Sequence, residues 1–107
     1  MRLKRTHYCG QLNASLEGKE VALCGWVDRW RDHGGVVFID LRDRYGTTQL
    51  IFDSTKNKEL ALQASRIKSE FVISILGTVF LRASGMHNPN MKTGEIEIHV
   101  DHLEILS

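Results

Sequence analysis

The 107-residue sequence predicts a small, mostly β domain of five strands, with one helix between the third and the fourth. Most of the chain alternates apolar and polar residues, which is typical of half-buried strands, and one central segment changes to helical spacing. The composition, 42% hydrophobic and 25% charged, is that of a globular protein. A chain of this length has room for one hydrophobic core, so we expect a single domain over residues 1–107.

The first three predicted strands follow one another directly. Residues 20–31 form the first, and Gly25 in its middle indicates a bulge or sharp coil where the strand passes from one sheet face to another. Residues 32–35 predict a turn, residues 36–42 the second strand, and residues 47–52 the third.

The second half of the chain contains the helix and two further strands. Apolar residues recur at helical spacing over residues 56–69, after the cap-type residues 53–55. Residues 71–82 and 95–106 alternate again, and the polar loop of residues 83–93 separates them. Five strands in this order, with the helix after the third, describe the OB-fold, a Greek-key barrel. Because the sequence stops at its last predicted strand, we expect a domain of a longer protein.

The charge balance and the motifs exclude several classes of protein. The formal net charge of +1 argues against a strongly basic nucleic-acid coat and against an acidic tail protein, although a specific nucleic-acid reader remains open. We expect no membrane span and no secretory signal, because no apolar run approaches ~20 residues and none follows the basic N-terminus. Cys9 and Cys24 lie far apart without a CxxC motif, which favours reduced thiols and a cytoplasmic location.

Phe38 is the sharpest candidate for a binding residue. Val37, Ile39 and Leu41 share one face of the second strand, which should be the core, and this parity places Phe38 outward beside Asp40. An outward aromatic ring on such a barrel can stack with an unpaired base. The alternative is that a loop covers Phe38, or that it is one of the single exposed apolar residues that most proteins carry.

The predicted strand pairing gathers polar partners around this ring. A four-residue loop over residues 43–46, between the second and third strands, would place Asp40 opposite Gln49 and Phe38 diagonal to Gln49. A four-residue turn before the second strand would place Arg29 opposite Phe38 and Arg31 opposite Val36. The amide can donate to and accept from a base edge, and the guanidinium groups can hold phosphate or a base. Taken alone, Gln49 would be a solvated surface amide.

The fifth strand presents acids on its outward face. Glu95, Glu97, His99 and Asp101 share this face. A carboxylate repels phosphate, but it can accept both N–H groups of a guanine Watson–Crick edge. The alternatives are a solvated strand face or an ion pair with Arg82.

Catalytic and metal sites are not favoured by the sequence. It contains no GxxxxGK[ST] phosphate loop, no GxGxxG and no GxSxG motif. His99 and His102 would point to opposite faces of a strand, so they would not share a metal ion without distortion. Cys9 and Cys24 are equally unsuited to act as a pair of ligands or nucleophiles, and we expect no cofactor in this domain.

The same residues carry a family likeness. The segment of residues 25–44, which contains GWV, an arginine and FIDLRDR, closely resembles the N-terminal anticodon-binding domain of bacterial-type aspartyl-tRNA synthetases. Residues 8–12 resemble the opening of that domain, and residues 93–97, TGEIE, resemble its last strand. With Gln49 between them, the combination is specific and extends over essentially the whole chain.

The resemblance implies roles for the outward residues. It implies that Phe38 stacks on the central uridine of the anticodon, that Gln49 pairs with the edge of that uridine, and that Glu97 reads the first base, guanosine or its queuosine derivative. Further polar residues around the anticodon are implied to be Arg31, Arg82 and Asn88.

Two loop residues bear on the third anticodon base, which is cytidine in tRNA(Asp) and uridine in tRNA(Asn). His33 and Gly85 resemble the pattern of relaxed family members that aspartylate both tRNAs. Glycine offers no side chain to exclude the wrong base, and histidine can donate or accept. The alternative is that both are ordinary turn residues.

The resemblance also implies a parent enzyme. Such an enzyme activates aspartate with ATP and Mg²⁺ and transfers it to the tRNA 3′ end, on a class II catalytic domain that is absent from this sequence. We expect the parent to be a homodimer in the cytoplasm, and the present chain to be a monomer that binds without catalysing.

Other readings remain open. A general single-strand binder with the same barrel should be more basic and carry several outward aromatic residues. A protein- or sugar-binding OB module would have no need of the Phe38, Gln49 and Arg31 constellation. The anticodon domain of an asparaginyl- or lysyl-tRNA synthetase is a closer rival, although the pairing of FIDLRDR with TGEIE favours the aspartyl branch.

Overall fold

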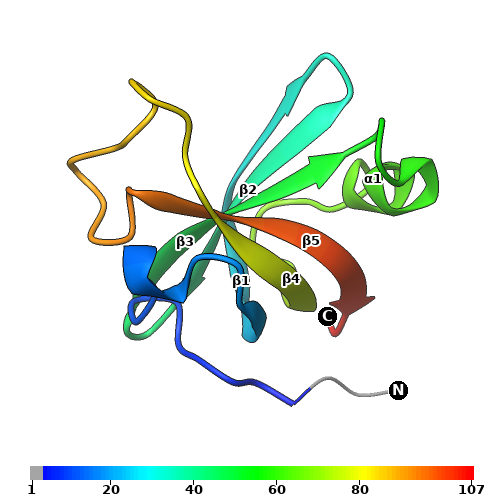
Figure 1. The fold of residues 1–107 in the computed structure, drawn as a ribbon. Helices are drawn as coiled ribbons and strands as arrows, with labels where there is room; N and C mark the ends of the chain where they lie inside the picture. The colour runs from blue at the N-terminus through cyan, green and yellow to red at the C-terminus, as the bar shows by residue number, and fades with distance from the viewer. Residues whose placement is uncertain (1–3) are drawn as a thin grey trace.

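The computed structural model describes residues 4–107 and contains a closed five-stranded barrel (Figure 1). Its elements in chain order are η1 (Ala14–Leu16), β1 (Glu20–His33), β2 (Val36–Asp43), β3 (Gly46–Asp53), α1 (Lys58–Ala64), β4 (Val72–Leu81) and β5 (Ile96–Ile105). The predicted OB-fold, with its helix between the third and fourth strands, is confirmed. The basic N-terminus, which was considered and rejected as the start of a secretory signal, begins with residues 1–3. These three residues lie outside the described residues.

The barrel closes because β1 pairs with two different neighbours. The strand order is β1-β2-β3-β5-β4, with β4 returning to β1. The first half of β1 pairs with β4 as far as Trp26, and its second half pairs with β2 from Trp26 onward. The pairing of β3 with β5 is parallel, and the other described pairings are antiparallel.

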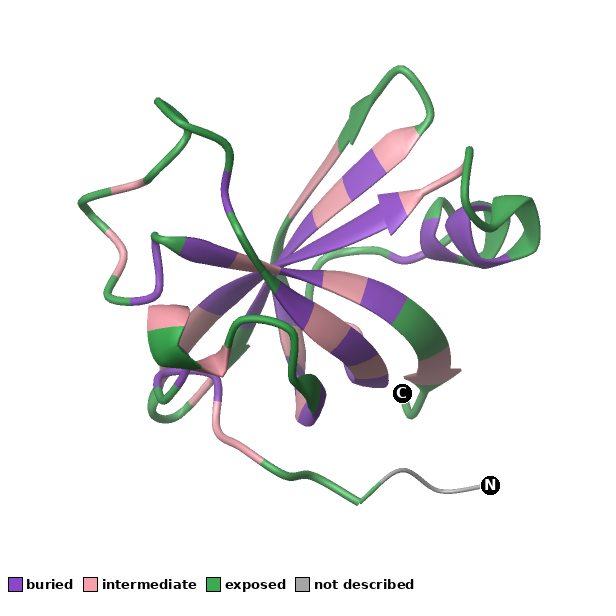
Figure 2. Ribbon diagram, in the orientation of Figure 1, coloured by how far each residue is buried: buried purple, intermediate pink, exposed green. Residues whose placement is uncertain are grey.

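Alternate strand residues point into one closed core, which Figure 2 shows as alternating bands along β5. Val37, Ile39 and Leu41 are at most 2% exposed, and Ile96 and Ile98 are fully buried. Burial of each large side chain of this kind contributes about 1.5–3 kcal/mol to folding. The predicted inward faces of the second and fifth strands are therefore confirmed.

The bulge in β1 lies elsewhere than predicted. The register with β2 shifts between Val27 and Arg29, so the extra residue is Asp28 and not Gly25. Gly25 serves a different purpose, because a Cβ atom there would lie 2.3 Å from the carbonyl oxygen of Arg42. The bulge bends β1 from one neighbour to the other, and the glycine lets β2 approach closely.

The turn between β1 and β2 is shorter than predicted. Gly34 and Gly35 form a two-residue connection with φ of +60° and +92°, which suits glycine best. His33 pairs with Val36, and Arg31 pairs with Phe38. The predicted pairing of Arg29 with Phe38 is therefore wrong, because residues 32 and 33 stay within the strand.

The helix is also shorter than predicted. It begins after Asn57, whose side-chain oxygen accepts from the N–H of Leu60, so residues 53–55 do not cap it. Ile67 lies beyond the helix and is still buried, which explains why helical spacing seemed to continue. Trp30 of β1 anchors the helix by donating from Nε1 to the carbonyl of Ala64 at 3.1 Å. No helix within residues 4–107 is long and apolar enough to cross a membrane.

Candidate nucleic-acid interface

A groove of about 660 Å³, called here the central groove, runs across the outward faces of β1, β2, β3 and β5 and is bordered by the start of the β4–β5 loop. It brings together six of the residues singled out in the sequence, which are Arg31, His33, Phe38, Gln49, Arg82 and Glu97. All five strands or their ends supply these side chains, so the barrel assembles the groove from residues up to 66 positions apart.

Phe38 forms the aromatic floor of one end of the groove. Its parity in β2 keeps it out of the core, and it is half-buried. The Arg31 guanidinium carbon lies 5.8 Å from the ring centroid, and the His33 ring meets Phe38 edge-on at 5.5 Å. Both neighbours follow from the register, since Arg31 stands opposite Phe38 and His33 two residues along β1. A base can stack on such a ring beside a cation.

Gln49 is held in place by Arg31. The arginine Nη2 donates to Gln49 Oε1 at 3.2 Å, and Gln49 is 7% exposed. With its oxygen engaged, the amide of Gln49 turns its N–H groups to any ligand in the groove. Asp40 stands opposite Gln49 in the register, as predicted, and its carboxylate lies 3.9 Å from the Arg31 guanidinium.

Asp40 contributes buried negative charge beneath the groove. Within the described part of the chain, its Oδ1 atom is buried and makes no hydrogen bond. The positive charges of Arg31, whose guanidinium lies 3.9 Å away, and of Arg82 compensate this charge. Asp40 therefore places a negative charge beside the guanidinium of Arg31, which also contacts Gln49 and lies near the ring of Phe38.

Arg82 lines the groove but is mostly committed to the fold. It is 8% exposed, and its Nε donates to the carbonyl of Ile96 at 2.9 Å. Burial lowers the pKa of this guanidinium, while the negative charges of Glu97 and Asp40 raise it. Arg82 thus supports the start of the β4–β5 loop and places a positive charge near two carboxylates.

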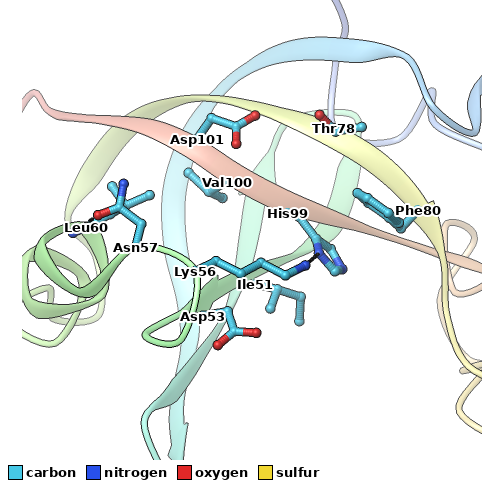
Figure 3. Close-up of a pocket in the computed structure, with 10 residues that line it drawn as sticks. All are labelled: Ile51, Asp53, Lys56, Asn57, Leu60, Thr78, Phe80, His99, Val100 and Asp101. Atoms are coloured by element: carbon cyan, nitrogen blue, oxygen red, sulfur yellow. Dashed lines mark hydrogen bonds between the residues drawn. The ribbon is translucent and has the colours of Figure 1, made fainter.

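Glu97 lies at the other end of the groove and is held by His99. Its Oε2 is 2.7 Å from His99 Nε2. The His99 ring stacks on Phe80 with centroids 4.1 Å apart, and its Nδ1 is 3.3 Å from Lys56 Nζ. Figure 3 shows Lys56 reaching across to His99, with Phe80 on the far side of the ring.

Sequence reasoning missed Lys56 and Phe80, and it considered His99 only as an outward residue and as a metal ligand that was not favoured. Phe80 pairs with Glu97, and Thr78 pairs with His99, so Phe80 and His99 are diagonal neighbours on one face of the β4–β5 pair. That register is set across the 14-residue loop between β4 and β5, whose length does not fix it, although the shared outward parity of Phe80 and Thr78 was visible.

The structure does not bring Asn88 and Gly85 into the groove. Asn88 organises its own loop, because its Oδ1 accepts from the N–H of Asn90 and its N–H donates to the carbonyl of Gly94. Gly85 is exposed with φ of +81°, and a Cβ atom there would meet nothing within 4 Å. From the same loop, the exposed Met86 does line the groove.

The described residues offer little for metal or thiol chemistry. Among residues 4–107, no three His, Cys, Asp or Glu side chains are grouped so that they could hold a metal ion. Cys9 is fully buried, and burial together with the nearby Asp43 carboxylate raises the pKa of its thiol. The arrangement of ring, amide, guanidinium and carboxylate in the groove is instead suited to binding bases.

Known proteins similar to this chain carry the same type of domain. The chain is 54% identical over 105 residues to an aspartate–tRNA(Asp/Asn) ligase of Desulfatibacillum aliphaticivorans, a match over 98% of this chain and 18% of the relative. It is 54% identical over 104 residues to an aspartate–tRNA(Asp/Asn) ligase of Protochlamydia amoebophila (strain UWE25), over 97% of this chain and 17% of the relative. The chain thus spans less than a fifth of these curated relatives, and the resemblance noted in the sequence is confirmed.

Solved structures agree with this. An aspartyl-tRNA synthetase from Entamoeba histolytica superposes with a TM-score of 0.84 at 26% identity, over 98% of this chain and 21% of that one. An asparaginyl-tRNA synthetase from Pyrococcus horikoshii gives a TM-score of 0.78 at 26% identity, over 94% of this chain and 23% of that one. Residues 21–106 match the tRNA anticodon family of OB-fold nucleic acid binding domains. Because that match extends from the second residue of β1 to the residue after β5, the chain belongs to this family.

Proposed function

We propose that the chain is the anticodon-binding domain of an aspartate–tRNA ligase and that the central groove reads the anticodon GUC. The observation that carries this proposal is the convergence of Phe38, Gln49 and Glu97 on one groove. It combines a stacking surface, an amide and a carboxylate in a protein whose relatives are aspartate–tRNA ligases.

The middle base stacks on Phe38. Base–aromatic stacking contributes about 1–3 kcal/mol per base. Because Arg31 already donates to Gln49 Oε1, the Gln49 amide presents N–H groups, which match the carbonyl oxygens of uracil. Arg31 adds a cation at the edge of the ring, where it also attracts the phosphate backbone.

The first base is read by Glu97. A carboxylate accepts the two adjacent N–H groups of guanine, whereas adenine offers a different edge. Repulsion between Glu97 and the RNA backbone is reduced by the positive charge of Arg82 nearby. Asn88 adds a polar contact from the β4–β5 loop when the RNA is bound.

His33 and Gly85 make recognition of the third base permissive. His33 lies edge-on to Phe38, where its ring can donate to or accept from either pyrimidine. Gly85 places no side chain beside the RNA. The parent enzyme then aspartylates both tRNA(Asp) and tRNA(Asn), and the names of its two relatives support this reading.

The parent enzyme supplies the chemistry that this domain lacks. Its class II catalytic domain activates aspartate with ATP and Mg²⁺ and transfers it to the 3′ end of the tRNA. The parent acts in the cytoplasm as a homodimer, and the isolated domain is a monomer that only binds.

A titration of the isolated domain with RNA tests the anticodon reading. An anticodon stem-loop containing GUC should bind better than a stem-loop of equal length and charge with a scrambled loop, at two salt concentrations. Equal binding of both loops contradicts specific reading. A salt slope that corresponds to many phosphate contacts would favour the general single-strand binder.

The permissive reading is tested on a fusion of this domain to its catalytic body. Rates of aspartylation of the two tRNAs are compared. A preference for tRNA(Asp) of a hundredfold or more, about 2.7 kcal/mol, contradicts it.

A further inference from the structure

The imidazole of His99 is held on three sides. Lys56 Nζ lies 3.3 Å from Nδ1, Glu97 Oε2 lies 2.7 Å from Nε2, and Phe80 stacks on the ring at 4.1 Å with an interplanar angle of 27°. The His99 and Glu97 side chains are 24% and 20% exposed, so both are largely shielded from water. Few rotations of either side chain remain available without breaking one of these contacts.

These contacts also determine the direction of the hydrogen bonds. An ammonium group has donors and no acceptor, so Nδ1 of His99 accepts from Lys56. In the neutral ring the proton is then on Nε2, which donates to Glu97. A chain of donors therefore runs from Lys56 through His99 to the carboxylate.

These hydrogen bonds leave acceptor positions on the Glu97 carboxylate available for a ligand. A carboxylate has about four lone-pair positions on its two oxygens, and His99 occupies one of them, on Oε2. Oε1 and the second position of Oε2 remain to accept two N–H groups that lie side by side. Glu97 lines the central groove, so these positions serve a base bound there.

The cavity next to the central groove holds the Lys56 side chain that supports His99, and it is not a second site for a base. This side pocket of about 270 Å³ shares Ile51, Asp53 and His99 with the central groove and is shown in Figure 3. Asp53 and Asp101 both line it and would repel a nucleotide phosphate. Lys56 spans the pocket to reach His99, which links the loop before α1 to β5.

We propose that His99 is a positioning residue that makes Glu97 selective for a base with two adjacent N–H donors, and that Lys56 acts through His99. This proposal rests on the proposed function, in which Glu97 reads a guanine-type base. It goes further by assigning selectivity to His99, which lines the groove beside Glu97, and to Lys56, which lies outside the groove.

The test measures discrimination and not affinity alone. Two anticodon stem-loops, identical except for guanosine or adenosine at the first anticodon position, are titrated against the domain. The wild type should prefer guanosine by about tenfold or more, because good paired hydrogen bonds to a base edge discriminate at this level. Glu97→Gln sets the value expected when the carboxylate is absent.

His99→Leu should reduce the preference to about that of Glu97→Gln and leave the affinity for the adenosine loop within about threefold. His99→Gln should restore most of the preference, because its amide N–H can replace Nε2–H and its oxygen can accept from Lys56. Lys56→Met should reduce the preference by less than His99→Leu does. Thermal melting of each variant shows whether it is folded. If His99→Leu does not fold, His99→Gln and Lys56→Met still test the proposal.

The outcomes separate the two proposals. A wild type without preference for guanosine overturns the reading by Glu97 and the role of His99 together. If Glu97→Gln removes the preference for guanosine and His99→Leu retains it, the role of His99 alone is overturned. The same holds if His99→Gln is no more selective than His99→Leu.

Discussion

The two borders of the central groove are built in different ways. Arg31, Phe38 and Gln49 sit on paired strands, where the barrel fixes each Cα and hydrogen bonds connect the side chains. The opposite border is the loop of residues 82–95, whose conformation depends on internal turns such as the one at Asn88. The strand side is fixed by barrel pairing, whereas the loop side is held mainly by its own turns, so we expect the strand side to be better preorganised for a base. The following substitutions, ordered by expected effect, test this contrast.

The largest effect is expected from the core beneath the strand side. Ile39 is fully buried and adjacent to Phe38, so Ile39→Ala should lower the free energy of unfolding by about 2–5 kcal/mol. Chemical denaturation measures this. The control is Leu62→Ala, which removes an apolar side chain that is 54% exposed and should change stability by less than about 0.5 kcal/mol. A comparable loss in both variants would mean that the barrel does not support the groove as described.

Phe38→Ala should separate binding from stability. It should weaken binding of the GUC stem-loop by about 1–3 kcal/mol through lost stacking, with little change in melting temperature. Tyr45→Ala removes an exposed aromatic ring outside the groove and should leave binding unchanged. A large fall in melting temperature for Phe38→Ala would show that the ring supports the fold.

The corrected register predicts that two arginines of β1 differ in importance. Arg31→Lys should weaken binding by about 1 kcal/mol, because lysine cannot hold Gln49 and also lie along Phe38. Arg29→Lys alters an exposed arginine on the same strand and should have no measurable effect. Titration of each variant with the GUC stem-loop measures the loss of affinity, and a greater loss for Arg29→Lys than for Arg31→Lys would contradict the role given to Arg31.

The smallest effect is expected in the loop. Gly85→Ala should cost about 1 kcal/mol of stability, because its φ of +81° disfavours a Cβ atom. Binding of the GUC stem-loop should change by less than about threefold, since the new methyl group meets open space. Denaturation and titration, with Ser84→Ala as control, measure both. A loss of binding as large as that of Phe38→Ala would show that the loop is as preorganised as the strands.

The same contrast explains what the sequence could reveal. Parity alone placed Phe38 outward and Ile39 inward, because a strand residue has only two faces to occupy. The loop between β2 and β3 was predicted two residues too long, because Asp43 and Gly46 still pair, but the predicted loop gives the same register, so Asp40 was correctly set opposite Gln49.

Where local signals competed, sequence reasoning was less successful. Asp32 and His33 resemble turn residues, yet the Gly34–Gly35 pair makes the whole turn, a signal for a two-residue hairpin that was available in the sequence. The contact of His99 with Glu97 lies within one strand face, but the contact of Lys56 with His99 joins elements distant in the chain, and no local pattern encodes it. The anticodon roles assigned to all of the candidate residues, from Phe38, Gln49 and Glu97 to Asn88 and Gly85, remain predictions.

The double pairing of β1 has a consequence for the order of folding. Its pairing with β2, and that of β2 with β3, join neighbours in sequence, whereas its pairing with β4 joins Glu20 to Thr78 and closes a long loop. Closing a long loop costs chain entropy, and this cost slows the formation of contacts between distant residues. We therefore expect the β1–β2–β3 meander to form in the folding transition state and the closure by β4 and β5 to follow. Mutational φ-values near zero in the meander would contradict this order. The stacking half of the groove would then exist before the carboxylate of Glu97 arrives, so a nascent chain acquires the surface that holds a base before it acquires the group that selects one.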